Sequence, residues 1–444
     1  MAARDAARDA VGLGLLGFGT IGTGVAKLLQ RNAALICERL GCDLRLVRIA
    51  DVETTRDRGV DLAGIRFDAD PEGLVDDPAV QIVIELVGGT DVARRLVLRA
   101  LERGKPVVTA NKALLALHGK EIFEAARRAG VDVAFEASVG GGIPILRSLR
   151  EGLAANRIER VYGILNGTTN FVLTEMERTG ESFEVVLKRA RELGYAEADP
   201  TFDVDGIDAA HKLTILAALC FGAELTFKEI PTEGIRGLEP VDFEAAAEFG
   251  HRIKLLAIAK QRPDERIEVR VQPTMIPAQS LLAKVDGVMN AIAVHGDAVG
   301  PTLFYGAGAG AFPTASAVVA DLMELARELR RGRGGRVSPL SYRPEALRPR
   351  PLVPLGELHG RAYLRFTAAD RPGVLSHLAG ALGEHGISIE SVIQKGRGHA
   401  GASVPVLVMT HPARESSVRA ALDAIDRLPD VTARSLLVRI EEDL

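Results

Sequence analysis

The N-terminal part of the chain joins a short apolar stretch directly to a glycine-rich turn and then to an amphipathic stretch. Residues 11–16 predict a strand, and Gly17-Phe18-Gly19-Thr20-Ile21-Gly22 separates it from a helix that we expect to reach about residue 40. A strand, a GxGxxG turn and a helix in this order predict a dinucleotide-binding unit. There Gly17 permits the tight turn, Gly19 lets the pyrophosphate approach, and Gly22 allows close packing of helix on strand. The amides at the start of the helix would face the phosphates.

The alternation of strand and helix continues to about residue 142. Helices are expected at 91–103 and 113–129, and apolar strands at 44–51, 80–89, 106–112 and 131–142. Such alternation is typical of an α/β fold with a doubly wound, Rossmann-type parallel sheet. We therefore assign residues 11–142 to a dinucleotide-binding domain and residues 1–10 to a flexible tail.

The end of the second expected strand bears on the choice of cofactor. Asp51 follows Gly22 by 29 residues, later than the usual ~20, because the first helix is long. Its carboxylate could accept a hydrogen bond from a ribose 2′-hydroxyl, which favours NAD. Arg48, Arg56 and Arg58 lie nearby and could meet a 2′-phosphate, which favours NADP. The sequence leaves both cofactors open.

Residues 143–330 are expected to form an α+β substrate domain, whose last helix, 315–330, packs back on the first domain. Five carboxylates lie between Glu197 and Asp208, just before an apolar helix that carries Lys212. A calcium loop of the EF-hand type is excluded, because Lys212 occupies the place of its bidentate glutamate. Two interpretations remain: a capped helix with a surface Asp208–Lys212 pair, or a polar site on a buried helix. Burial lowers the pKa of a lysine and suits it to proton transfer near neutral pH.

Several long motifs between residues 11 and 330 resemble the homoserine dehydrogenase family and occur in its order. They are "GFGTIGTGV", "VTANKALLA", "EASVGGGIPI", "GILNGTTNF", "LGYAEADPTFDVDGIDAAHKLTILA" and "YGAGAG". The resemblance implies an NAD(P)-dependent enzyme that interconverts L-homoserine and L-aspartate 4-semialdehyde in threonine, methionine and isoleucine biosynthesis.

The resemblance also implies roles for individual residues. Lys212 matches the proton-transferring lysine and Asp208 its acidic partner. Glu197 and Asp203 would bind the substrate ammonium, and Lys112 would lie near nicotinamide and substrate. The remaining matches are a sodium loop that offers mainly backbone oxygens, and a glycine pair that returns to the cofactor: Glu136, Val139, Gly141 and Ile143 for sodium, Gly306 and Gly308 for the cofactor.

The last third of the chain predicts a connector and a further module. Residues 331–360 are rich in Arg, Gly and Pro and are expected to be semi-extended. Residues 361–444 show a βαββαβ order, which suits a ferredoxin-like fold, and "DRPGVLSHLAGALGEHGISI" resembles an ACT domain. That resemblance implies a small amino-acid effector, for which we expect threonine, near Gly373. ACT modules usually pair, so a homo-oligomer is expected; a purely structural module is the alternative.

Composition narrows the remaining choices. A net charge of −4 and few aromatic residues give no sign of a nucleic-acid partner. The sequence contains no apolar run of about 18 residues, so we expect no membrane-spanning helix. Three cysteines without a CxxC motif favour a reducing compartment, the cytoplasm. The alternatives to the family's activity are another NAD(P)-dependent amino-acid dehydrogenase, or a non-catalytic amino-acid sensor. A semialdehyde dehydrogenase would need a nucleophilic cysteine, a role that Cys37 and Cys42 fit poorly.

Overall fold

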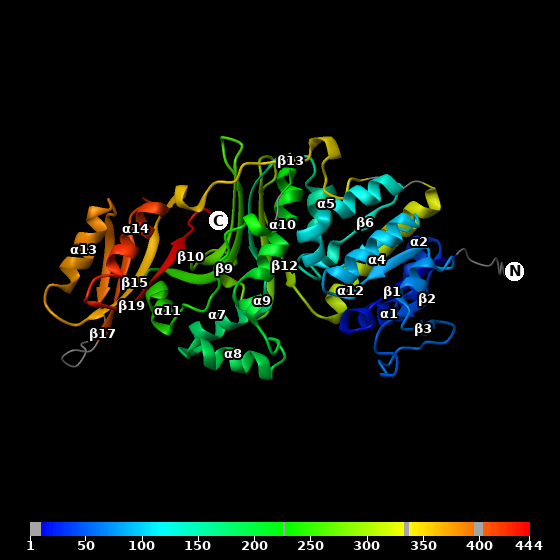
Figure 1. Cartoon of the computed structure of the whole chain (residues 1–444), viewed down its shortest axis with the longest axis horizontal. Coiled ribbons are helices and arrows are strands. Elements are labelled where there is room, and N and C mark those ends of the chain that lie inside the picture. The colour runs from blue at the N-terminus through cyan, green and yellow to red at the C-terminus, as the bar shows by residue number, and fades with distance from the viewer. Residues whose placement is uncertain (1–9, 225–226, 333–336, 395–402) are drawn as a thin grey trace, which may run out of the picture. The chain divides into compact units, whose positions relative to one another are not determined.

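The computed structural model describes residues 10–224, 227–332, 337–394 and 403–444. The chain forms two compact units, each assembled from three separate stretches (Figure 1). Unit 1 comprises residues 1–158, 211–229 and 290–349, and unit 2 comprises residues 159–210, 230–289 and 350–444.

Unit 1 is built on a six-stranded sheet with the order β3-β2-β1-β4-β5-β6, in which neighbouring strands run parallel. This order confirms the doubly wound, Rossmann-type sheet. Its strands are β1 (Ala10–Leu16), β2 (Asp43–Ala50), β3 (Arg66–Asp68), β4 (Ile82–Glu85), β5 (Val107–Thr109) and β6 (Val133–Ala134). Its helices are α1 (Thr20–Arg31), α2 (Ala33–Leu40), α3 (Pro71–Asp76), α4 (Asp91–Glu102) and α5 (Lys112–Ala129).

The prediction of a single long first helix is wrong, because the helix is interrupted at Asn32. This residue has φ −107° and ψ 15°, outside the helical region, and it ends α1 and begins α2. Asparagine is a poor residue for a helix interior because its short amide competes for backbone hydrogen bonds. The break therefore converts one expected helix into two.

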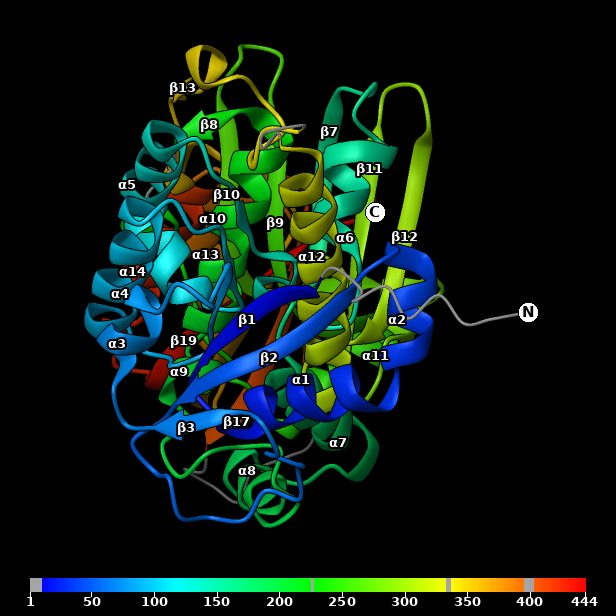
Figure 2. The same ribbon diagram turned by 90° about the vertical axis from the view of Figure 1, so that its right-hand side faces the viewer.

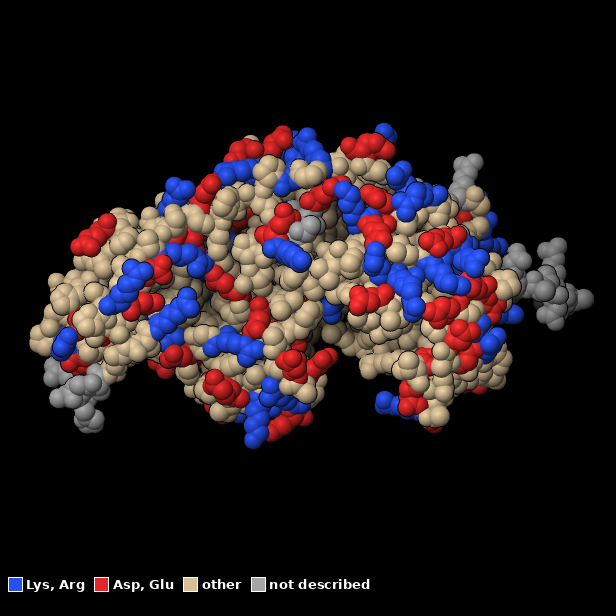
Figure 3. Space-filling model, in the orientation of Figure 1, with Lys and Arg blue, Asp and Glu red and all other residues tan. Residues whose placement is uncertain are grey.

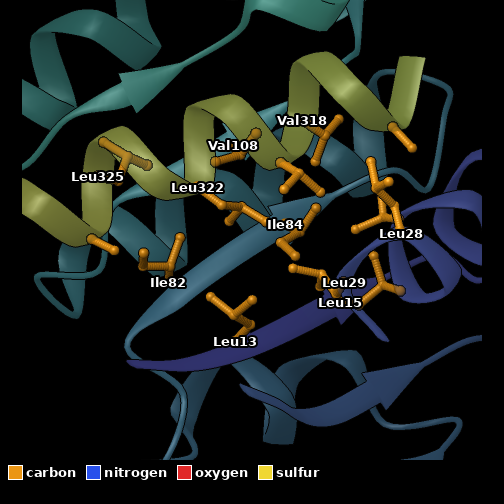
Figure 4. Close-up of a cluster of buried hydrophobic side chains, with 14 of the residues drawn as sticks. Leu13, Leu15, Leu28, Leu29, Ile82, Ile84, Val108, Val318, Leu322 and Leu325 are labelled. Carbon is orange, nitrogen blue, oxygen red and sulfur yellow. The ribbon is translucent and has the colours of Figure 1, made fainter. Parts of the chain in front are cut away.

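The helix α12 (Ala311–Arg331) comes from much later in the chain but packs against this sheet (Figure 4). Val318, Leu322 and Leu325 lie in one buried cluster with residues of β1, β4 and α1. Helices α12 and α1 lie next to each other (Figure 2), and a Cβ at Gly24 of α1 would lie only 2.6 Å from the carbonyl oxygen of Ala311. Strands β11 (Met289–Gly296) and β12 (Gly300–Ala307) lead into this helix.

Unit 2 contains strands in the order β7-β9-β10-β19-β15-β17-β16. Strands β9 (His251–Gln261) and β10 (Ile267–Pro277) pair antiparallel over their whole length, and β7 (Ile158–Ile164) pairs antiparallel with β9. This part confirms the expected mixture of helices and antiparallel strands. Its helices are α7 (Gly167–Thr179), α8 (Phe183–Glu192), α9 (Thr201–Val204) and α11 (Pro240–Glu248), and α10 (Ile207–Phe221) follows α9 in the chain.

The C-terminal part of unit 2 has the expected βαββαβ order. Strands β15 (Ala362–Ala369), β16 (Ile389–Gln394), β17 (Ser403–Thr410) and β19 (Val431–Ile440) form an antiparallel sheet, and helices α13 (Val374–Glu384) and α14 (Glu415–Ile425) pack against each other beside it (Figure 1). Strand β19 also pairs in parallel with β10, at Thr274–Arg439 and Met275–Ile440. The ferredoxin-like module therefore shares a continuous run of strands with the rest of unit 2.

The surface does not separate charges by sign. On the face shown in Figure 3, Lys and Arg are interspersed with Asp and Glu in both parts of the chain. Among the described residues, no helix combines the length and apolar character that a membrane crossing needs.

Candidate active site

The glycine-rich turn of unit 1 has the conformation that a phosphate-binding loop needs. Gly17 has φ +88°, and a Cβ there would lie 2.4 Å from the carbonyl oxygen of Leu86. A Cβ at Gly22 would lie 2.2 Å from the carbonyl oxygen of Gly17, whereas one at Gly19 would meet nothing within 4 Å. No side chain caps the first turn of α1. Its amides and the open side of Gly19 therefore suit a pyrophosphate.

Asp51 directly follows β2 and is hydrogen-bonded to the glycine-rich turn. Its carboxylate accepts hydrogen bonds from the amides of Phe18 at 2.5 Å and Glu53 at 2.8 Å. Arg58 Nε donates to the carbonyl oxygen of Phe18 at 2.6 Å. The guanidinium carbon of Arg58 lies 4.9 Å from the Phe18 ring centroid, and its Nη2 lies 3.7 Å from Asp51 Oδ1. A carboxylate and a guanidinium thus both lie beside the loop.

The three arginines that could meet a 2′-phosphate are in different environments. Arg48 is buried, and its guanidinium lies within 3.4 Å of three carboxylates, those of Asp68, Asp70 and Asp77. Arg48 is therefore committed to a structural cluster. Arg56 is exposed, and Arg58 alone among the three contacts the glycine-rich turn.

A buried carboxylate that the sequence reasoning missed organises the loops after β4 and β5. Glu85 is fully buried and accepts hydrogen bonds from Thr109 Oγ1 at 2.6 Å and the amide of Val87 at 3.0 Å. Burial raises the pKa of Glu85. Thr109 Oγ1 accepts from the amide of Asn111 at 3.0 Å, and Asn111 caps α5, whose first residue is Lys112. The available sequence signal was an acid ending the apolar strand "VIE".

The expected cation loop is not part of a long strand, since β6 ends at Ala134 and a 3₁₀ turn, Glu136–Ser138, follows. The Glu136 carboxylate accepts from the amides of Leu146 at 2.9 Å and Arg147 at 2.7 Å. Its side chain is thus committed to the start of α6 (Ile145–Arg147), leaving the backbone carbonyl as its possible ligand. Among the described residues, no group of three or more His, Cys, Asp or Glu side chains could hold a metal.

The same loop packs against the "YGAGAG" turn. The Gly142 amide donates to the carbonyl oxygen of Ala307 at 3.0 Å, and a Cβ at Gly141 would lie 2.4 Å from the carbonyl oxygen of Gly308. A Cβ at Gly306 would lie 3.1 Å from Ile143. Because α12 begins directly after this turn and packs on α1, both glycine-rich turns belong to the unit that carries the dinucleotide loop.

In unit 2, one amide joins two of the predicted carboxylates. Asn166 is buried, and its Nδ2 donates to Asp203 Oδ1 at 2.7 Å and to Asp208 Oδ2 at 2.9 Å. Its Oδ1 accepts from the amide of Thr169 at 2.8 Å and so caps α7. Asn166, in the family motif "GILNGTTNF", was not among the predicted site residues; its position just before a helix was the available signal.

Asp208 and Lys212 lie one turn apart on α10. Asp208 is 4% and Lys212 8% exposed, and residues four apart share a helix face. The interpretation of this pair as a surface ion pair is therefore wrong. Glu197, by contrast, is exposed in the loop between α8 and α9, which Thr168 holds by donating to the carbonyl oxygen of Tyr195 at 2.6 Å.

Sequence profiles of known families cover most of the chain. "Homoserine dehydrogenase" matches residues 144–323, "Homoserine dehydrogenase, NAD binding domain" matches residues 17–136, and "ACT domain" matches residues 362–430. A homoserine dehydrogenase from Pseudomonas aeruginosa is 47% identical over 97% of this chain and 99% of its own length. One from Bacillus subtilis is 38% identical over 97% of this chain and 98% of its own length.

Solved structures agree with these sequence matches. A homoserine dehydrogenase from Thiobacillus denitrificans superposes with a TM-score of 0.91 at 48% identity, over 98% of this chain and 99% of that chain. A hyperthermophilic archaeal homoserine dehydrogenase in complex with NADPH gives a TM-score of 0.60 at 27% identity, over 71% of this chain and 98% of that chain.

Proposed function

This chain belongs to the homoserine dehydrogenase family, and from that premise we propose how its residues interconvert L-homoserine and L-aspartate 4-semialdehyde. The observation that carries the proposal is the bridge from Asn166 to Asp203 and Asp208, followed one helical turn later by the buried Lys212. The two carboxylates supply anionic oxygens that can bind an ammonium, and Lys212 supplies a cationic group near them. A small zwitterionic substrate with an alcohol group needs both.

The turn from Gly17 to Gly22 and the start of α1 would hold the dinucleotide, with Asp51 and Arg58 beside its adenosine ribose. When bound, the nicotinamide ring supplies the acceptor or donor of a hydride. Both cofactor forms fit this chemistry, because Asp51 can accept from a 2′-hydroxyl and Arg58 can pair with a 2′-phosphate. The NADPH complex of the archaeal relative supports the second form.

Substrate orientation would come from carboxylates on α9, on α10 and in the preceding loop. Asp203, joined by Glu197, binds the substrate ammonium, and the Asn166 amide fixes the carboxylate of Asp203 in one orientation. Asp208, which Asn166 joins to Asp203, would hold the ammonium of Lys212 by its charge. Lys112, the first residue of α5, would lie near the nicotinamide and the reacting end of the substrate, as the family resemblance implies.

Lys212 would move the proton. During oxidation of homoserine its amine accepts the hydroxyl proton, directly or through water, as C4 loses hydride. During reduction of the semialdehyde its ammonium donates to the alkoxide that develops on the aldehyde oxygen, and its charge stabilises that oxygen beforehand. Asp208 does not itself exchange the proton; it keeps Lys212 in place.

A monovalent cation such as sodium would be held by backbone oxygens of Glu136, Val139, Gly141 and Ile143. The commitment of the Glu136 carboxylate to two amides supports a backbone-only contribution from that residue. Gly140 and Gly141, with φ of +72° and +55°, turn the chain sharply, as a carbonyl-lined loop requires. Sodium dependence of activity, compared with lithium and potassium at constant ionic strength, would test this site.

The ACT domain at residues 362–430 suggests regulation. We propose threonine as effector, bound near the turn that Gly373 closes with φ +94° at the start of α13, and pairing of these modules in a homo-oligomer. Threonine, methionine and isoleucine titrated into the full-length enzyme would identify the effector. In the described part of the chain, Cys37, Cys42 and Cys220 form no disulfide, which supports the proposal of a reducing compartment, the cytoplasm.

The decisive experiment measures homoserine-dependent absorbance of reduced nicotinamide for the native chain and for Lys212→Ala. Because general acid–base catalysis typically contributes ~10²–10⁴-fold, kcat should fall by that order while the enzyme still binds cofactor. Lys120→Ala is the matched control, since Lys120 lies on exposed α5 surface paired with Glu224. Near-full kcat in Lys212→Ala would show that its pair with Asp208 is purely structural.

A further inference from the structure

Three arginines of the C-terminal module reach residues between α10 and α11. Arg439 of β19 is buried and donates from Nη1 to Glu233 Oε2 at 2.8 Å and from Nη2 to Glu233 Oε1 at 3.2 Å. Arg419 of α14 donates to Glu233 Oε1 at 2.7 Å. The buried Glu415 accepts from both of these guanidiniums and fixes them from the side of the module. Arg365 of β15 adds a bond to the carbonyl oxygen of Gly237 at 2.8 Å.

Residues 231–237, which include Glu233 and Gly237, also contact the carboxylate-rich residues 197–208. We call residues 231–237 the bridging segment. The Ile235 amide donates to the carbonyl oxygen of Val204 at 2.9 Å, and Arg236 donates to Asp205 Oδ1 at 2.5 Å. A Cβ at Gly234 would lie 2.3 Å from the carbonyl oxygen of Val204. The bridging segment therefore contacts the last residue of α9, one position after Asp203.

The bridging segment has little freedom to absorb a displacement. The Glu233 amide donates to the carbonyl oxygen of Val271 at 2.8 Å, and the Val271 amide donates to that of Pro231 at 2.9 Å. Ile235 is fully buried. A movement of Glu233 must consequently shift α9 or break these bonds, because packed interiors do not deform continuously.

We propose that Glu233 is a positioning residue for Asp203, through which the C-terminal module sets the affinity for homoserine. The inference rests on the proposed role of Asp203 in binding the substrate ammonium. An arrangement of the module that withdraws Arg419 and Arg439 from Glu233 releases the bridging segment and loosens α9. Lys212 lies on the following helix, so substrate binding weakens while proton transfer proceeds at its usual rate.

Glu233→Gln keeps the side-chain shape and removes its charge. It should raise KM for homoserine about 2- to 30-fold, the range that coupling contacts usually span, and leave kcat and the KM for the cofactor unchanged. Glu441→Gln is the matched control, because Glu441 also joins the C-terminal strand to β9 and β10, through Lys260 and Arg270, without touching the bridging segment. It should leave KM unchanged. Arg419→Gln, at a more exposed partner of Glu233, should repeat the effect more weakly if Glu233→Gln folds poorly.

A double-mutant cycle with Asp205→Asn tests the route itself. Both changes act on one connection, so their effects on KM should not multiply. In hydrogen exchange, the Ile235 amide should be exposed faster in Glu233→Gln than in Glu441→Gln. A KM within twofold of native in folded Glu233→Gln, or fully multiplicative effects, would overturn the proposal.

Asp203→Asn separates this inference from the function on which it rests. If Asp203→Asn raises KM but Glu233→Gln does not, the positioning role is wrong and the substrate site stands. If Asp203→Asn leaves KM unchanged, the substrate role of Asp203 fails, and the positioning role fails with it.

Discussion

Replacing Asn166 by aspartate changes one atom of the side chain and reverses its relation to the two acids. The native Nδ2 donates to Asp203 at 2.7 Å and to Asp208 at 2.9 Å, whereas an aspartate oxygen at the same place can donate to neither. The other oxygen still accepts from the Thr169 amide, and aspartate caps helices as well as asparagine does. Asn166→Asp therefore isolates the loss of the bridge from any loss of α7.

The magnitude follows from the number of bonds that survive. The new carboxylate would lie within about 3 Å of the carboxylates of Asp203 and Asp208, and two unit charges at that separation repel by roughly 6 kcal/mol at an effective dielectric constant of 20. Protonating one carboxyl at pH 7 costs only about 4 kcal/mol, so the cluster should take up a proton. That proton restores one of the two bonds. The other, worth about 1.5–3 kcal/mol because it involves a charged group, is lost, which corresponds to a 10- to 150-fold fall in kcat/KM.

Initial rates of homoserine oxidation, followed by reduced-nicotinamide absorbance, would measure this fall. The KM for the cofactor and the Tm should change little. The matched control is Asn156→Asp, because the amide of Asn156 bonds only backbone groups, the carbonyl oxygen of Leu153 and the amide of Val299. If folded Asn166→Asp keeps kcat/KM within threefold of native, the bridged acids do not bind substrate as described.

Other changes address the remaining assignments. Glu197→Ala should raise KM for homoserine several-fold with little change in stability, because its side chain is exposed; an unchanged KM would exclude it from the site. Asp51→Asn should favour NADP over NAD and Arg58→Ala the reverse, by about tenfold each if one contact of ~1.4 kcal/mol is at stake; equal effects on both cofactors would contradict the assignment. Burial is the main cause and repulsion from Glu136 the second cause that raise the pKa of Asp321 to about 7. The folded state therefore keeps a proton that the unfolded state loses near pH 4. Stability should therefore fall as pH rises from about 4 to 7, and Asp321→Asn should remove that part of the pH dependence of Tm; parallel profiles for native and variant would refute it.

The sequence was most informative where a local pattern determines a local structure. The strand, glycine turn and helix around Gly17–Gly22 predicted the dinucleotide unit, because the backbone conformation at Gly17 admits few alternatives. The burial of Lys212 followed from the apolar residues around it on α10. Both depend on neighbours within a few positions.

Contacts between distant residues were beyond the sequence. Nothing near Asn166 in the chain indicates that its amide meets acids 37 and 42 residues later. Glu85 was expected inside an apolar strand, yet it ends β4 and accepts a hydrogen bond from Thr109 at the end of β5, which makes it an organising group. The break at Asn32 depends on a single residue inside a favourable helical pattern, which periodicity alone does not detect.

The composition of each unit from three separate stretches has a consequence for biosynthesis. Unit 1 needs residues 290–349 as well as its N-terminal sheet, and α12 covers strands made about 200–300 residues earlier. Unit 2 needs β19 (Val431–Ile440), which pairs with the much earlier strand β10 (Ile267–Pro277). During synthesis from the N-terminus, the sheet of unit 1 emerges long before its covering helix, and β10 long before its partner. We expect the nascent chain to expose apolar strands until α12 and β19 have been made, and to depend on chaperones during that interval.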